Sequence, residues 1–428
     1  MYDAMTGDYI LTIVNGSSFN KLLLDDHGGL MGYYLSIIDG QRSLVVWNST
    51  RTILRGPSCT GDLNNAWQWR PTQDGIYDFQ NGIEWTAPIA EEIDGNSIRL
   101  SVVGVDEESE TVLMSYYSGQ SSYFQGGWYV YADYDSVDGH LLWGPVNQTK
   151  VENSRLLVGA ETMGNGVWVE FDSAALTATG FSLATGNKVW GPNPMPNVNP
   201  FTSLGQRYSN GPDGALLTWT YGGDAYFIDM ATGTFNWEYH APSSGYESPY
   251  GTWPFWTFSV GTVADCKLFV SVSHMYSPPL FHHAQQMALN LTEGSVVWSI
   301  TAFDVTSAPA ISDGVMVTLN AYDNQLYAWG KGPTKMTVDA PNIGLTTATP
   351  ITIRGTIMEI SAGSQQEAPA ARFPNGLPCV SEENQQTWME YVYMQQPRPT
   401  KATGVDVTIS VLDPNGNCYD VTTTTSDD

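Results

Sequence analysis

The stretch FSLATGNKVW, Phe181 to Trp190, carries a pattern that recurs along the chain. It reads as the end of one strand, a Thr-Gly turn, and a second strand that ends in a large aromatic residue. The same phrase ends 47 residues earlier at Trp143 (190 − 143 = 47) and 47 residues later at Trp237 (237 − 190 = 47). Looser copies end at Trp85 and Trp298. Self-similarity with a period of about 40 to 50 residues predicts a propeller or a solenoid.

The residue types of the phrase suit the docking of one small sheet against the next. A turn glycine accepts a positive φ without a Cβ clash. A Trp on the following strand supplies a large apolar contact to the neighbouring sheet, and its loss is expected to cost about 3 to 5 kcal/mol. The predicted docking pairs are Gly82 and Trp85, Gly139 and Trp143, Gly186 and Trp190, Gly233 and Trp237, and Gly294 and Trp298.

AxDxxTGxxxW-like phrases at this period resemble the repeats of quinoprotein (PQQ-type) β-propellers. The resemblance covers about residues 1–333. It implies a β-propeller fold. The family includes quinone-dependent alcohol dehydrogenases, which bind PQQ and Ca²⁺, and also cofactor-free surface or assembly scaffolds. The motif describes blade docking and contains no cofactor ligand, so we expect no cofactor, with PQQ and Ca²⁺ as the alternative.

The chain is expected to be all-β with two parts. Residues 1–332 are predicted to form a propeller of about seven four-stranded blades, with six or eight as alternatives, and residues 54–77 read as an inserted loop. A linker over 333–345 leads to a partial Ig-like β-sandwich over 346–428. Within it, 381–399 is the best helix candidate. The opening inside a repeat phrase and the TTTTSDD ending suggest a fragment of a longer, exported protein.

The net charge of the chain limits the classes of partner that it is expected to bind. The 428 residues contain 17 Lys and Arg against 44 Asp and Glu, a formal net charge of −27. Without a basic stripe to neutralise phosphates, no nucleic-acid partner is expected. The acidity also disfavours anionic lipid surfaces, so membrane attachment is expected only through an anchor outside this chain.

The four cysteines form no CxxC motif, which leaves zinc-ribbon, thioredoxin-like and haem c interpretations without support. Of the three ways to pair them, Cys379 with Cys418 is favoured, because both lie in the C-terminal region.

Two clusters raise the question of a metal. Asp133, Asp135 and Asp138 suggest a calcium loop, but their spacing departs from an EF-hand, and Asp residues that cap a hairpin turn are the favoured interpretation. His274, His282 and His283 lie within ten residues of one another, and loop or interface histidines are favoured over a metal site.

Two further groups concern ligands. Tyr250, Trp253 and Trp256 form a possible platform for a sugar or a quinone, weighed against packing between blades. A quinone dehydrogenase also needs an Asp base and acidic ligands, and Asp224, Asp229 and Asp304 are the carboxylates to test. No adjacent cysteine pair accompanies them.

The first hypothesis is a non-catalytic, extracellular or cell-surface binding or scaffold protein with protein or cell-surface glycan partners. The alternatives are a PQQ-dependent oxidoreductase and a glycan-binding or glycan-processing propeller.

Overall fold

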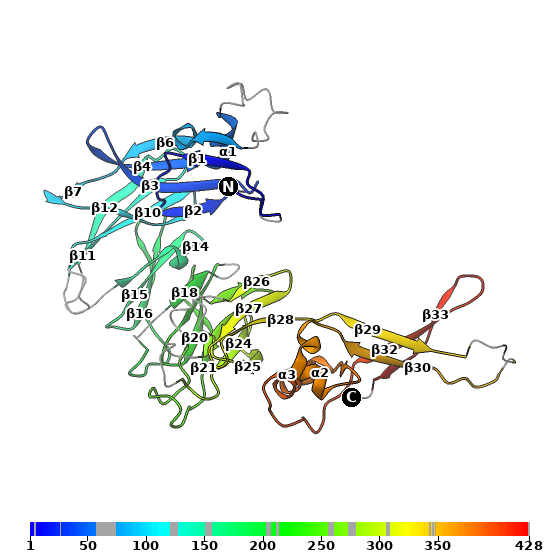
Figure 1. Ribbon diagram of the computed structural model, residues 1–428. Helices are drawn as coiled ribbons and strands as arrows, with labels where there is room; N and C mark the ends of the chain where they lie inside the picture. The colour runs from blue at the N-terminus through cyan, green and yellow to red at the C-terminus, as the bar shows by residue number, and fades with distance from the viewer. Residues whose placement is uncertain are drawn as a thin grey trace. The chain divides into compact units, whose positions relative to one another are not determined.

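The computed structural model describes most of the 428 residues (Figure 1). The described chain omits residues 4–5, 26, 57–73, 120–126, 150–155, 203–206, 211–213, 256–260, 273–279, 305–308, 342–343, 345, 347 and 427–428. It separates into two compact units, Met1–Tyr239 and His240–Asp428.

The first unit is built from antiparallel sheets, each a meander of strands in chain order. The first sheet comprises β2 (Lys21–Leu24), β3 (Leu30–Ile38), β4 (Gln41–Asn48) and β6 (Ile83–Pro88). The second comprises β9 (Ser101–Asp106), β10 (Thr111–Tyr117), β11 (Trp128–Asp135) and β12 (Leu141–Thr149). The third comprises β13 (Leu156–Leu157), β15 (Val167–Asp172), β16 (Thr177–Ser182) and β17 (Lys188–Pro194), with β14 (Met163–Gly164) also paired to β15. The fourth comprises β18 (Arg207–Asn210), β19 (Ala215–Trp219), β20 (Asp224–Asp229) and β21 (Phe235–His240).

The second unit continues the series. Its first sheet comprises β22 (Thr262–Ala264), β23 (Lys267–Val272), β24 (Gln285–Asn290) and β25 (Val296–Thr301). The next has three strands, β26 (Ala310–Ser312), β27 (Val315–Asn320) and β28 (Gln325–Gly330). Four-stranded antiparallel meanders of this kind are the blades of a β-propeller, so the predicted fold class is confirmed. The described residues form five such sheets and the three-stranded sheet β26–β28, six in all, and six was one of the two alternatives to the expected seven.

Alternation along the strands explains how neighbouring blades share cores. In β10, Val112 and Met114 join a core with the first blade, whereas Leu113 between them joins a core with the third. In β11, Val130 and Ala132 likewise face the first blade. Successive side chains of a strand point to opposite faces, so the second sheet is apolar on both faces and packs against the first sheet on one side and the third on the other.

Short elements complete the first unit. The opening strand β1 (Leu11–Val14) pairs in parallel with β5 (Gly75–Asp78). The helix α1 (Ser49–Leu54) begins after Asn48, whose side chain accepts a hydrogen bond from the Arg51 N–H. β7 (Glu92–Ile93) and β8 (Asn96–Ser97) form a small hairpin. Most of the predicted inserted loop at 54–77 lies outside the described residues.

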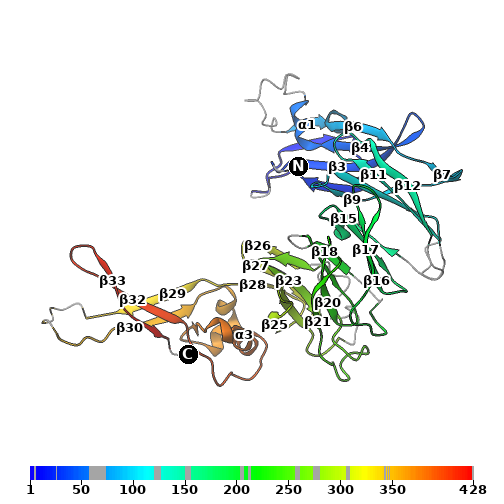
Figure 2. The same ribbon diagram turned by 180° about the vertical axis from the view of Figure 1, so that it is seen from behind.

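The C-terminal region contains two small sheets and two helices, seen again from behind in Figure 2. One sheet comprises β29 (Thr334–Asp339), β30 (Arg354–Glu359) and β31 (Leu377–Pro378); the other is the hairpin β32 (Asp406–Leu412) and β33 (Cys418–Thr425). The helices are α2 (Glu367–Arg372) and α3 (Gln385–Tyr393). The helix expected within 381–399 is therefore confirmed, whereas the Ig-like assignment and the domain boundaries stay predictions.

In α3, Trp388 and Val392 lie four residues apart, on one face, and pack with Leu377 and Val380 in a small core of their own. None of the described helices is long and apolar enough to cross a membrane.

Candidate functional site

The recurring Trp residues share one position in the fold. Trp85, Trp143, Trp190, Trp237 and Trp298 are each the third residue of the outermost strand of their sheet. The expectation that each strand ends in its Trp is therefore wrong, because the strand continues beyond the indole. Trp298 packs against Trp329 with ring centroids 5.8 Å apart.

The indole of Trp143 reaches from the second blade to the turn of the third. Its Nε1–H donates to the Leu183 carbonyl at 2.5 Å. A methyl group added at Gly186 would lie 2.8 Å from Trp143 Cε3, so the glycine leaves room for the ring. Gly186 also has φ +73°, a conformation that favours glycine.

The next pair of blades repeats this contact. Trp190 Nε1–H donates to the Met230 carbonyl at 2.7 Å, and a methyl group at Gly233 would lie 2.4 Å from Trp190 Cδ2. Leu183 and Met230 each stand three residues before the turn glycine. The sequence analysis did not single out these carbonyl positions, although the fixed offset from the glycine marks them.

The three other turn glycines complete the comparison. A methyl group at Gly139 would lie 2.5 Å from Trp85 Cζ3, so the Trp85 ring of the first blade lies over the turn glycine of the second. Gly294 has φ +70°. Gly82 differs from the expectation of a positive φ: it ends a 3₁₀ turn, and a methyl group there would lie 2.4 Å from Trp47 Nε1. Close approach of the indole thus explains a glycine at that position.

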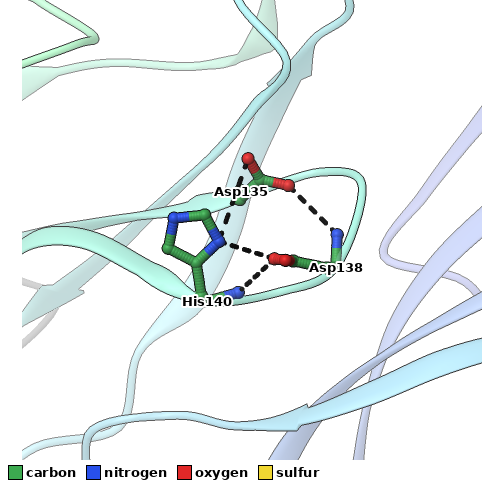
Figure 3. Close-up of side chains that lie close together, drawn as sticks. All are labelled: Asp135, Asp138 and His140. Carbon is green, nitrogen blue, oxygen red and sulfur yellow. Dashed lines mark hydrogen bonds and ion pairs between the residues drawn. The ribbon is translucent and has the colours of Figure 1, made fainter.

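The β11–β12 turn gathers Asp135, Asp138 and His140 (Figure 3). Asp135 Oδ1 accepts the backbone N–H groups of Val137 at 2.7 Å and Asp138 at 3.0 Å, which confirms the turn-capping interpretation. Asp138 Oδ1 lies 2.6 Å from His140 Nδ1. The sequence analysis did not include His140 among the candidate residues.

Within the described chain, these are the one group of three metal-ligating side chains whose ligand atoms lie within 4.8 Å of one another. The hydrogen bond to Asp138 raises the pKa of His140, and the backbone N–H of His140 is the main cause that lowers the pKa of Asp138. The cluster is exposed or half-exposed, and its carboxylates already serve the turn.

Asp133, two residues before the turn, is fully buried in β11. Its Oδ1 accepts the Tyr134 N–H at 2.9 Å, and its Oδ2 has no hydrogen-bond partner among the described residues. Burial, with a smaller contribution from the charge of Asp106, raises the pKa of Asp133 to about 8. The sequence placed Asp133 in a possible calcium loop, but the structure places it in a blade interior.

The candidate quinone carboxylates make structural bonds. Asp224 Oδ1 accepts from Asn197 Nδ2 at 3.0 Å, and Asp229 Oδ1 accepts from the Thr232 N–H at 2.9 Å. Asp304 Oδ2, in the second unit, accepts from Ser271 Oγ at 3.0 Å.

Asp224 and Asp229 begin and end β20, which separates them by about 16 Å along an extended strand. A Ca²⁺-bound quinone needs ligands that converge on one point, so these two carboxylates do not fit a shared site.

The aromatic candidates are used in packing. Tyr250 and Trp253 pack against a cluster of Phe281, Ala284 and Phe303. Trp256 lies outside the described residues, as does His274. His282 Nδ1 lies 3.0 Å from Glu247 Oε2, and the adjacent His283 has φ +59°.

The expected disulfide is not formed, because Cys379 and Cys418 are both free. Cys379 follows β31 of one sheet, whereas Cys418 begins β33 of another, opposite Leu412. Proximity in the sequence did not bring them together.

No known family model matches the chain, and no curated protein matches it.

Among solved structures, the chain is similar to BamB from Moraxella catarrhalis, at 13% identity over 58% of this chain and 62% of that chain, with a TM-score of 0.35. It is also similar to the quinohemoprotein alcohol dehydrogenase ADHIIG from Pseudomonas putida HK5, at 13% identity over 55% of this chain and 43% of that chain, with a TM-score of 0.30. A third is the computationally designed protein Ika8, at 10% identity over 76% of this chain and 75% of that chain, with a TM-score of 0.37. The matched region spans less than two thirds of BamB and of the dehydrogenase. The propeller architecture stands on the sheets of this chain and not on these distant likenesses.

Proposed function

We propose that this protein is a non-catalytic binding or scaffold protein built on a β-propeller, that it works outside the cell or at the cell surface, and that its partner is another protein. The observation that carries this proposal is an apolar surface on the hairpin β32–β33. Its members are Val411 and Tyr419, exposed by 44% and 55%, and the nearby Leu412 and Val421 are exposed by 69% and 63%. Exposed apolar surface that is contiguous marks interaction sites more often than isolated apolar residues do.

The hairpin register makes Val411 and Tyr419 neighbours on one face, because they lie directly opposite each other. Leu412, which lies opposite Cys418, points to the other face. Every residue of β33 is exposed. A two-stranded hairpin is marginally stable by itself, so a partner that covers this face would also stabilise it.

Charge defines the partner further. The hairpin segment 406–425 contains Asp406, Asp413 and Asp420 and no Lys or Arg. A complementary partner has an apolar centre and a basic rim. Export is supported by the acidic, lysine-poor composition and remains part of the proposal.

The experiment compares a hairpin variant with a matched control. Val411→Ser with Tyr419→Ser removes apolar surface from the face that these two residues share. Leu326→Ser removes an exposed apolar side chain (72%) from β28. Quantitative affinity capture from the extracellular fraction of the source cells should give partners that bind the wild type and the control but not the hairpin variant. Partners retained equally by all three proteins would contradict the proposal.

A ligand titration distinguishes the scaffold proposal from the oxidoreductase alternative. A ligand bound only by the native state raises the Tm by mass action. A saturable rise in Tm at micromolar PQQ with Ca²⁺, together with dye reduction on addition of alcohols, would overturn the scaffold proposal. We expect an unchanged Tm at a hundredfold excess of the quinone.

A further inference from the structure

The strand β29 has one open edge. In the described chain it pairs with β30 alone, and all six of its residues are exposed. An open edge with unpaired backbone groups is a template for pairing with another strand. The occupant can be argued from the sequence of this strand, Thr334-Lys335-Met336-Thr337-Val338-Asp339.

The hydrogen-bond pattern shows which backbone groups face the open side. The Ile360 N–H donates to the Pro333 carbonyl at 2.9 Å, and this pair is one step beyond the Thr334–Glu359 pair in the same register. Odd-numbered residues of β29 therefore bond to β30. In an antiparallel ladder the direction alternates, so the N–H and C=O groups of Met336 and Val338 point to the open edge.

We propose that β29 pairs with β29 of a second copy of this chain, antiparallel and centred on Thr337. This register places Met336 opposite Val338 of the second copy, and Val338 opposite Met336, in hydrogen-bonded pairs. The two side chains share one face of the strand and are exposed by 68% and 76%. The result is one sheet that runs through two chains related by a two-fold axis.

Charge favours this register over those centred two residues away. On the opposite face, centring on Thr337 places Lys335 against Asp339 of the second copy, twice. Centring on residue 335 would place lysine against lysine, and centring on residue 339 would place aspartate against aspartate. Opposite charges across a strand pair stabilise it, whereas like charges destabilise it. Among the ion pairs of the described residues none involves Lys335 or Asp339, although Arg354 of β30 lies opposite Asp339.

The hairpin strand β32 makes a useful comparison. Its one charged residue is Asp406, so self-pairing offers no ion pair. The complementary ends of β29 therefore distinguish its open edge from that of β32. This inference uses a surface other than the proposed partner-binding patch, and its failure would leave that patch untouched.

Sedimentation equilibrium of the full chain at about 150 mM salt tests the proposal, with four proteins compared. We expect the wild type to reach twice the 46.9 kDa chain mass. Lys335→Asp alone and Asp339→Lys alone each create like-charge pairs and should weaken association by about tenfold or more, since two cross-strand pairs change sign at once. The double variant, Lys335→Asp with Asp339→Lys, regenerates both ion pairs and should associate within about threefold of the wild type.

Three results would overturn the proposal: a wild type that stays monomeric at about 100 μM, single variants that associate as the wild type does, or a double variant that stays as weak as the singles. Circular dichroism confirms that each exposed substitution leaves the fold intact. As a second measurement, Thr337→Cys lies on the proposed axis, where the two Cβ atoms are about 4.5 to 5.5 Å apart, close enough to cross-link. Mass spectrometry should find a 337–337 disulfide between chains, and its absence under oxidation contradicts the register.

Discussion

The indole of Trp143 lies over Gly186 of the following blade and donates its N–H to the Leu183 carbonyl. Trp190 makes the same contacts with Gly233 and the Met230 carbonyl. The recurring phrase therefore joins adjacent blades: its Trp docks onto the turn of the next copy, and its own turn receives the Trp of the preceding copy.

Removal of a docking indole should destabilise the protein strongly. Trp143→Ala deletes a large side chain that packs between two blades, and we expect a loss of about 3 to 5 kcal/mol in the free energy of unfolding. Trp143→Phe keeps a ring and loses the hydrogen bond to Leu183, so a smaller loss of about 1 to 2 kcal/mol is expected. Urea unfolding monitored by circular dichroism measures both. Equal losses for the two variants would contradict a role for ring packing.

A methyl group added at the turn glycine should destabilise the folded protein for two separable reasons. Gly186→Ala combines an unfavourable positive φ with a clash against Trp143. Gly95→Ala, in the β7–β8 turn, is the matched control, because φ is +77° there and nothing lies within 4 Å of the added methyl. We expect Gly95→Ala to cost about 1 kcal/mol and Gly186→Ala at least about 1 kcal/mol more. Similar losses of unfolding free energy for both variants would mean that the Trp143 indole moves aside at little cost.

The buried carboxyl of Asp133 should make stability depend on pH. Its pKa rises from 3.8 to about 8 in the folded protein, so between these values the folded state holds a proton that the unfolded state has lost. Its contribution to stability is complete below about pH 4, falls as the pH rises toward 8, and is lost above that. Asp133→Asn should be more stable than the wild type by about 1 to 3 kcal/mol at pH 8, with the difference vanishing near pH 4.

The control for Asp133 is Asp39→Asn, which removes one negative charge from the exposed β3–β4 turn. Unfolding free energies of the three proteins from pH 4 to pH 9 give the comparison. A difference between wild type and Asp133→Asn that does not change with pH would show that the carboxyl is not protonated in the folded protein.

The exposed pair of Asp138 and His140 predicts a shift that NMR can follow. The hydrogen bond between them raises the pKa of the imidazole. Asp138→Asn keeps an acceptor oxygen but removes the charge, so the pKa of His140 should fall in the variant. An unchanged His140 titration curve would show that the contact is absent in solution.

The free thiols give a direct test of the cysteine assignment. Cys418 is exposed and should react rapidly with a thiol reagent. Cys379 is half-buried and burial raises its pKa, so it should react more slowly. Peptide mapping under non-reducing conditions should find no 379–418 disulfide, and its presence would restore the pairing expected from the sequence.

The sequence predicts most of the repeating fold and little of its surfaces. The turn glycines and the regularly spaced Trp residues mark the blades in the sequence, because both make the contact between adjacent blades. Leu183 and Met230 contribute only carbonyl groups, which every residue has, so no residue type marks them. Asp133 looked like a turn ligand because sequence spacing does not show that a carboxylate faces a blade interior. The pairing of Cys379 with Cys418 failed because sheet membership, and not separation along the chain, decides which thiols meet.

A double-mutant cycle on Trp143 and Gly186 tests the docking of adjacent blades most directly. If the indole lies over the glycine, the added methyl of Gly186→Ala clashes only while Trp143 is present. In the Trp143→Ala background, Gly186→Ala should therefore cost only the strain of its positive φ, about 1 kcal/mol, and the coupling free energy between the two sites should be at least about 1 kcal/mol. Additive losses, with coupling below about 0.3 kcal/mol, would contradict the contact and the docking it represents.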